Sequence, residues 1–143
     1  MACCLIDTNI LPYLIDTASP FHEAARAHLA SLTDQDEVVL SVLSLHELHQ
    51  WFAYDPASQA SAQEIVGAFR ILPLPEAGAE LFGALMRDPR GGSTRAEVQR
   101  HAVDCMIAVT ALENGAVLVS NDAFFGQLIE LIPALQIDNW AAV

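Results

Sequence analysis

The chain has 143 residues, of which 53% are hydrophobic and 17% are charged, a composition that excludes a disordered or fibrous protein. No apolar stretch is long enough to span a membrane and no basic segment leads into a secretion signal, so we expect one cytoplasmic domain over residues 1–143. The net charge is −12, and all six basic residues are arginines. Because an acidic surface repels nucleic acid, a polyanionic partner requires metal ions or a local arginine cluster.

Predicted strands alternate with predicted helices, which is typical of a three-layer α/β/α domain with a mainly parallel central sheet. Apolar runs such as EVVLSV indicate strands buried on both faces, while Pro89 and Gly115 mark helix ends. In chain order we expect a strand at 3–7, helices at 10–15 and 20–32, a strand at 37–42, helices at 44–54 and 57–69, a strand at 70–74, a helix at 76–88, a loop at 89–94, a helix at 97–114, a strand at 116–120, a short helix around Phe124 and Phe125, and an edge strand at 135–138.

Four acidic residues fall near the ends of predicted strands. Asp7 ends the first strand, and Asp122 follows the fourth strand by two residues. Glu47 lies in the first turn of the helix after the second strand, and Asp104 lies in an apolar helix. In open α/β sheets, ligands bind at the edge formed by the carboxyl ends of the strands, so we expect the acids to gather there. Asp104 is either near that edge or a charge buried at a cost.

Helix capping is the alternative explanation for each acid. Asp7, Asp104 and Asp122 can each cap a predicted helix, and Ser44 with Glu47 has the spacing of a capping box. Capping does not explain why four acids fall at one edge of the sheet. Two carboxylates about 5 Å apart repel by about 3 kcal/mol at an effective dielectric near 20. A gathering of four therefore calls for a divalent cation such as Mg²⁺ or Mn²⁺.

Three segments carry a family resemblance: LIDTNIL at the N-terminus, SLHELHQ after the second strand, and HAVDCMIAVTALENGAVLVSNDAFF towards the C-terminus. With the length of the chain, they resemble a PIN domain, and within that family the VapC-type toxin ribonucleases of type II toxin-antitoxin systems. The resemblance covers almost the whole chain, although residues 56–95 match only in general character. It implies a metal-dependent endoribonuclease that hydrolyses RNA phosphodiester bonds.

The resemblance also assigns roles to residues. It implies four catalytic acids, which are Asp7, Glu47, Asp104 and Asp122. Asp7, Asp104 and Asp122 would be direct ligands of one or two Mg²⁺ or Mn²⁺ ions. Glu47 would bind a second ion or anchor the attacking water. Three polar neighbours complete the site, of which Asn9 and Ser120 would orient the carboxylates: Thr8, Asn9 and Ser120.

Partners follow from the same resemblance. It implies an RNA substrate, a homodimer, and a small antitoxin whose C-terminal segment covers the active site. A basic or amphipathic antitoxin tail would be attracted to a surface with a net charge of −12. The apolar segments around Leu29, Trp51 and Phe52 are candidates for the antitoxin groove or the dimer contact.

The arginines cluster in the segment that leads into Asp104. Four of the six lie there: Arg87, Arg90, Arg95 and Arg100. We expect this segment, and Arg90, Arg95 and Arg100 in particular, to form a basic lip that binds RNA phosphates. A solvated loop with no role in binding is the alternative.

Other site types fit the sequence less well. The histidines of HELH are at i and i+3, whereas a zinc protease needs i and i+4. His101 precedes Asp104 by three residues and could approach the acidic site, although a helical surface histidine is the favoured interpretation. Receiver domains and haloacid-type phosphatases rely on a lysine, which this chain lacks, and Asn9 replaces the second aspartate of the phosphatase D-x-D motif. A catalytically silent PIN-like module that binds RNA or protein remains the alternative function.

Overall fold

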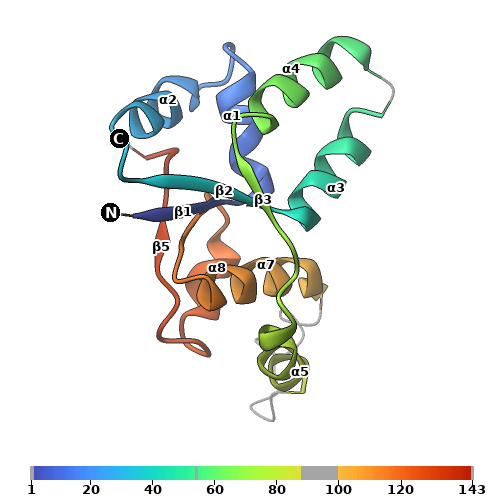
Figure 1. Cartoon of the computed structure of the whole chain (residues 1–143), viewed down its shortest axis with the longest axis vertical. Coiled ribbons are helices and arrows are strands. Elements are labelled where there is room, and N and C mark those ends of the chain that lie inside the picture. The colour runs from blue at the N-terminus through green and yellow to red at the C-terminus, as the bar shows by residue number, and fades with distance from the viewer. Residues whose placement is uncertain (1, 54, 88–99, 143) are drawn as a thin grey trace.

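The computed structural model describes residues 2–53, 55–87 and 100–142, and within them a five-stranded sheet forms the centre of the fold (Figure 1). The strand order is β3-β2-β1-β4-β5, and every pairing is parallel. The bounds are β1 Cys3–Ile6, β2 Glu37–Ser41, β3 Arg70–Leu72, β4 Val117–Val119 and β5 Ile137–Asp138. The predicted α/β domain with a mainly parallel sheet is therefore confirmed.

Helices cover both faces of this sheet (Figure 1). One face carries α1 Leu11–Ile15, α2 His22–Ala30, α3 Val42–Trp51 and α4 Pro56–Val66. The other face carries α5 Ala79–Met86, α7 Ala102–Glu113 and α8 Ala123–Leu128. Two short 3-10 helices, η1 Thr8–Ile10 and η2 Glu76–Gly78, precede α1 and α5. None of the helices in these described ranges is long and apolar enough to cross a membrane.

The inner strands separate two hydrophobic cores. Successive strand residues point to opposite faces, so Leu5 packs into the core under α7 and α8, while Ile6 packs into the core under α1 to α4. Both side chains are fully buried. Val39 and Leu40 of β2 divide in the same way. Burial on both faces explains why these strands are continuous apolar runs in the sequence.

The helix after β2 begins earlier than predicted. Helix α3 starts at Val42, directly after β2, and the Ser41 hydroxyl accepts a hydrogen bond from the Leu43 N–H. The predicted capping box of Ser44 and Glu47 is therefore wrong, because Ser41 already caps the helix. Ser44 is fully buried inside α3, and Glu47 lies in its second turn rather than its first.

The segment predicted as one helix over 76–88 is divided. It consists of η2 followed by α5, and Gly78 lies at their junction. A Cβ atom at Gly78 would lie 2.1 Å from Cγ1 of Val109 in α7. The close approach of η2 to α7 therefore requires glycine at this position. The predicted helix over 97–114 is α7 in its described part, which starts at Ala102.

Candidate functional site

The carboxyl ends of the inner strands bring the predicted acids to one edge of the sheet. Asp7 directly follows β1, and Asp122 follows β4 and precedes α8. Glu47 comes from α3 after β2, and Asp104 comes from the first turn of α7. The negative charges of Asp104 and Glu47 both act on Asp7. Asp104 is thus placed at the sheet edge, and it does not cap its helix, because the N-cap position of α7 is His101.

Asp7 is the most enclosed of these acids. Its residue is 4% exposed, and both carboxylate oxygens accept hydrogen bonds. The Thr8 N–H donates to Oδ1 over 2.8 Å, and the Ser120 hydroxyl donates to Oδ2 over 2.8 Å. Burial raises the pKa of Asp7 from 3.8 to about 7; the charges of Asp104 and Glu47 add to this, and the two hydrogen bonds oppose it. Asp7 also caps η1, so capping and clustering occur together.

Glu47 is held through Thr8 and Ser44. The Thr8 hydroxyl oxygen lies 2.8 Å from Oε1 of Glu47 and 2.9 Å from the Ser44 hydroxyl oxygen. Since the Thr8 hydroxyl has one hydrogen, it donates to the carboxylate and accepts from Ser44. Thr8 is 3% exposed and Ser44 is fully buried. Two buried hydroxyls therefore fix the orientation of the Glu47 carboxylate.

Ser120 connects Asp7 with the loop that carries Asp122. Its hydroxyl donates to Asp7 and accepts a hydrogen bond from the Asp122 N–H over 3.0 Å. The Asp122 carboxylate accepts from the Phe124 N–H over 3.0 Å, so Asp122 is the N-cap of α8. The capping interpretation is thus correct for Asp122 as well. The Asp122 carboxylate also lies close to the side chains of His101 and Asp104.

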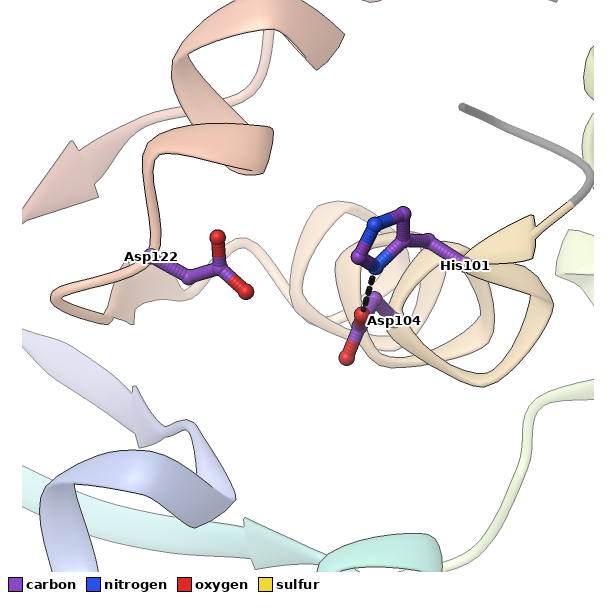
Figure 2. Close-up of side chains that lie close together, drawn as sticks. All are labelled: His101, Asp104 and Asp122. Atoms are coloured by element: carbon purple, nitrogen blue, oxygen red, sulfur yellow. Dashed lines mark hydrogen bonds and ion pairs between the residues drawn. The ribbon is translucent and has the colours of Figure 1, made fainter. Parts of the chain in front are cut away.

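His101 and Asp104 form a pair beside Asp122 (Figure 2). Nδ1 of His101 lies 2.7 Å from Oδ2 of Asp104, and their side chains are 27% and 25% exposed. The imidazole stacks on the Phe124 ring, with centroids 4.2 Å apart and an interplanar angle of 16°. The prediction of an ordinary surface histidine is therefore wrong. Its ring is fixed between an aromatic face and a carboxylate of the site.

These three side chains have the spacing of a metal site. One ligand atom each from His101, Asp104 and Asp122 lies within 4.8 Å of the others. In Figure 2 the Asp122 carboxylate points towards the imidazole and the carboxylate of the pair. Asp7 and Glu47 are outside this group among the described residues.

The donor set fits a divalent cation. Within residues 2–53, 55–87 and 100–142, no arginine forms an ion pair with Asp7, Asp104 or Asp122. Oδ1 of Asn9 is a buried acceptor with no hydrogen-bond partner in the described part of the chain. Carboxylates that have no arginine partner in these ranges, close to one another and to an imidazole nitrogen, favour a bound divalent cation.

The predicted basic lip lies largely outside the described residues. Arg90 and Arg95 fall in the segment 88–99, which the structure does not describe. Arg87 and Arg100, on either side of it, are exposed. Arg70 is bonded to Glu37 over 2.5 Å at the amino ends of β3 and β2, which is the sheet edge opposite the acids. The role of Arg90, Arg95 and Arg100 in RNA binding stays a prediction.

A thiol nucleophile is excluded at this site. Cys105 is adjacent to Asp104 in the sequence, and it is fully buried. Burial, with the charge of Asp104, raises the pKa of the Cys105 thiol to about 12. The reactive form of cysteine is the thiolate, which is not populated at such a pKa near neutral pH.

Two structural contributors were not predicted as part of the site. Ser44 supports Thr8 from inside α3, and the Phe124 ring supports His101. The spacing of Ser44 and Glu47, three residues apart on one helical face, is a sequence signal for a shared contact. Phe124 gives no such signal, because its contact with His101 depends on how α7 and α8 pack.

Comparisons with known proteins agree with this architecture. The model of the PIN domain matches residues 4–130 of the chain. Among solved structures, a chain of VapBC2 from Rickettsia felis bound to a promoter DNA fragment is 20% identical with a TM-score of 0.72, covering 96% of this chain and 98% of that chain. A chain of DNA-bound VapBC from Salmonella typhimurium is 23% identical with a TM-score of 0.68, covering 98% and 99%. A chain of a toxin-antitoxin complex from Klebsiella pneumoniae is 20% identical with a TM-score of 0.64, covering 92% and 94%.

At these identities the solved structures show a shared fold. A search of curated protein sequences gives no match. The family model spans nearly the whole sheet, from β1 to α8, and includes all four predicted acids. The chain therefore belongs to the PIN domain family, as its sequence segments predicted.

Proposed function

We propose that this chain is a metal-dependent endoribonuclease that hydrolyses RNA phosphodiester bonds, and that it is the toxin of a type II toxin-antitoxin pair. The observation that carries the proposal is the gathering of Asp7, Glu47, Asp104 and Asp122 at one sheet edge of a PIN domain. No arginine in the described ranges neutralises the three aspartates. A cation is the simplest compensation for this charge.

Asp104 and Asp122 would hold the ion directly, and Asp7 would complete the carboxylate set. Glu47 would bind a second ion or anchor the attacking water. A Mg²⁺ or Mn²⁺ ion supplies two effects when bound, a lowered pKa of water and an offset to the negative charge on the phosphate. A side-chain nucleophile is not required, which agrees with the raised pKa of the Cys105 thiol.

The surrounding hydroxyls keep the carboxylates in place before substrate binds. Ser120 donates to Asp7 and accepts from the Asp122 backbone, so it fixes the distance between the β1 and β4 ends. Thr8 donates to Glu47 and is supported by Ser44. Side chains held in this way need little reorganisation when charge develops on a phosphate, and such preorganisation is a large part of electrostatic catalysis.

An antitoxin partner is part of the proposal. Solved structures that share this fold include a toxin-antitoxin complex, and the net charge of −12 would attract a basic segment. An apolar groove between α3 and α4, lined in part by Leu45, Phe52 and Val66, offers a surface for such a segment. Trp51, at the end of α3, is 48% exposed. A homodimer is expected from the family resemblance.

Cleavage of a total RNA pool by the purified chain tests the function. We expect discrete fragments with Mg²⁺ or Mn²⁺, and no fragments with EDTA or with the Asp7→Asn variant. The matched control is Asp34→Asn, which removes the same charge from an exposed position outside the site. A folded wild-type protein that binds Mn²⁺ and cuts no RNA would contradict the proposal and favour a catalytically silent binding module.

A further inference from the structure

We propose that His101 is a nitrogen ligand of the metal ion, and that it makes the site select Mn²⁺ over Mg²⁺. The inference rests on the proposed function, because it concerns the ion of the same site. Mg²⁺ is a hard ion that takes oxygen ligands almost exclusively, whereas imidazole is a good ligand for first-row transition metals. One nitrogen in a carboxylate set therefore shifts preference away from Mg²⁺.

The donor atoms already have suitable spacing. Nδ1 of His101 and Oδ2 of Asp104 are 2.7 Å apart. Two neighbouring ligands that each lie about 2.1 Å from one octahedral ion are about 3 Å apart. One atom of Asp122 lies within 4.8 Å of both residues' ligand atoms. A single ion can therefore contact all three side chains after small movements.

The imidazole is also held in place for this role. It stacks on Phe124, which is 4% exposed and belongs to the hydrophobic core. The N–H of the same Phe124 donates to the Asp122 carboxylate. One residue thus positions two of the three ligands, His101 through its ring and Asp122 through its backbone. A histidine on an open helix surface has no such constraint.

A positioning role is the competing explanation. In that role an Nδ1–H of His101 would donate to Asp104 and orient the carboxylate without touching the ion, whereas ligation through Nδ1 needs the tautomer with its proton on Nε2. The two roles differ in one observable. A ligand transfers unpaired spin density from Mn²⁺ to its nitrogen, whereas a residue that acts through Asp104 does not.

Pulsed EPR of the Mn²⁺-loaded protein tests the inference directly. We expect a histidine nitrogen modulation in the spin echo that changes when histidine is labelled with ¹⁵N. The modulation should be lost in His101→Gln and kept in His49→Gln, an exposed histidine of α3. In competition titrations, His101→Gln should lower the affinity for Mn²⁺ more than the affinity for Mg²⁺, because imidazole is a ligand that first-row transition metals accept and Mg²⁺ does not favour.

The outcomes separate this inference from the proposed function. RNA cleavage by a Mn²⁺-loaded protein without nitrogen modulation would overturn the ligand role of His101 and leave the ribonuclease intact. Nitrogen modulation without cleavage of any RNA would support the ligand role and overturn the ribonuclease. A folded protein that binds no Mn²⁺ would overturn both. Circular dichroism of each variant verifies the fold.

Discussion

The site has two halves that differ in how they are held. The buried half consists of Asp7, Thr8 and Ser44, and Glu47, which is only partly buried, is bonded to it through Thr8. The open half consists of His101, Asp104 and Asp122. Asp7 is 4% exposed, whereas the side chains of His101 and Asp104 are 27% and 25% exposed. Protein donors occupy both carboxylate oxygens of Asp7, whereas in the described residues they occupy one oxygen each of Glu47, Asp104 and Asp122.

This difference indicates that the two halves of the acidic cluster have separate roles. A buried carboxylate fixed by neighbouring donors sets the shape and field of the site, and it cannot easily turn towards a ligand. A partly exposed carboxylate can exchange water for a metal ion or a phosphate oxygen at a lower cost. Variants in the buried half should therefore change stability first, and variants in the open half should change metal binding first.

The largest expected effect is an increase in the free energy of unfolding of the metal-free protein when Asp7 is replaced by asparagine. The folded pKa of Asp7 is about 7 and its ordinary value is 3.8, so between these pH values the folded state binds the proton that the unfolded state releases. Stability from this group is therefore lost as pH rises from about 4 to 7. This loss in the free energy of unfolding is at most about 4 kcal/mol. Asparagine does not ionise and avoids the loss, but one of its hydrogen bonds would be imperfect, which costs about 1 kcal/mol.

Urea unfolding in EDTA at pH 4 and pH 8 measures this gain. We expect Asp7→Asn to unfold at a higher urea concentration than the wild type at pH 8, and at a similar one at pH 4. Added Mn²⁺ should reduce the difference at pH 8 only if Asp7 contributes to ion binding, because the ion would then stabilise the wild type more than the variant. A difference that does not depend on pH would show that the charge of Asp7 is not the cause.

Asp122→Asn tests the open half. Asparagine caps a helix as well as aspartate does, so the free energy of unfolding should change by less than about 0.5 kcal/mol. The affinity for Mn²⁺ should fall by at least about 10-fold, since a charged ligand is lost. Isothermal titration calorimetry and urea unfolding measure the two quantities. A large loss of stability with unchanged affinity would reverse the proposed division.

Thr8→Val examines the support of Glu47. The substitution keeps the shape of the side chain and removes the hydroxyl that joins Ser44 to Glu47. We expect a loss of about 1 to 2 kcal/mol in the free energy of unfolding, because the buried Ser44 hydroxyl loses a partner. Thr17→Val, at an exposed position, is the control and should change stability little. Equal effects of the two variants would remove the argument for a buried network.

The smallest effect is expected from the arginines. Replacing Arg90 and Arg95 with alanine should weaken RNA binding about uniformly across sequences and lower the slope of log K against log salt by about 2. Arg26→Ala, on the exposed surface of α2, is the control. Filter binding of RNA at several salt concentrations gives the slopes. An unchanged slope would show that the basic lip does not offset the acids of the open half.

Most of the fold follows from the sequence because the inner strands are buried on both faces. Leu5, Ile6, Val39 and Leu40 have no exposed surface, so their strands are apolar runs that cannot be confused with amphipathic helices. The positions of the acids follow from the same reasoning. A parallel sheet places the ends of its strands at one edge, and Asp7 comes directly after such a strand.

The parts that were not predicted depend on contacts between elements far apart in the chain. The spacing of Ser44 and Glu47 is that of a capping box. However, α3 begins directly after β2, so Ser41, the last residue of β2, is the residue that caps the helix. The sequence around His101 fits a surface histidine, because its contact with the Phe124 ring depends on the packing of α7 against α8 and not on neighbouring residues. Local patterns describe local alternatives, whereas tertiary packing decides between them.

The edges of the sheet limit how another protein can bind. The outer strands are short, with three residues in β3 and two in β5. A short edge presents few unpaired backbone groups, and this protects a sheet from joining that of a neighbour. A peptide partner therefore has too little strand to extend the sheet by β-augmentation. Association with an antitoxin or a second copy would have to use helices and side chains, so its specificity would be encoded in side-chain complementarity rather than in backbone pairing.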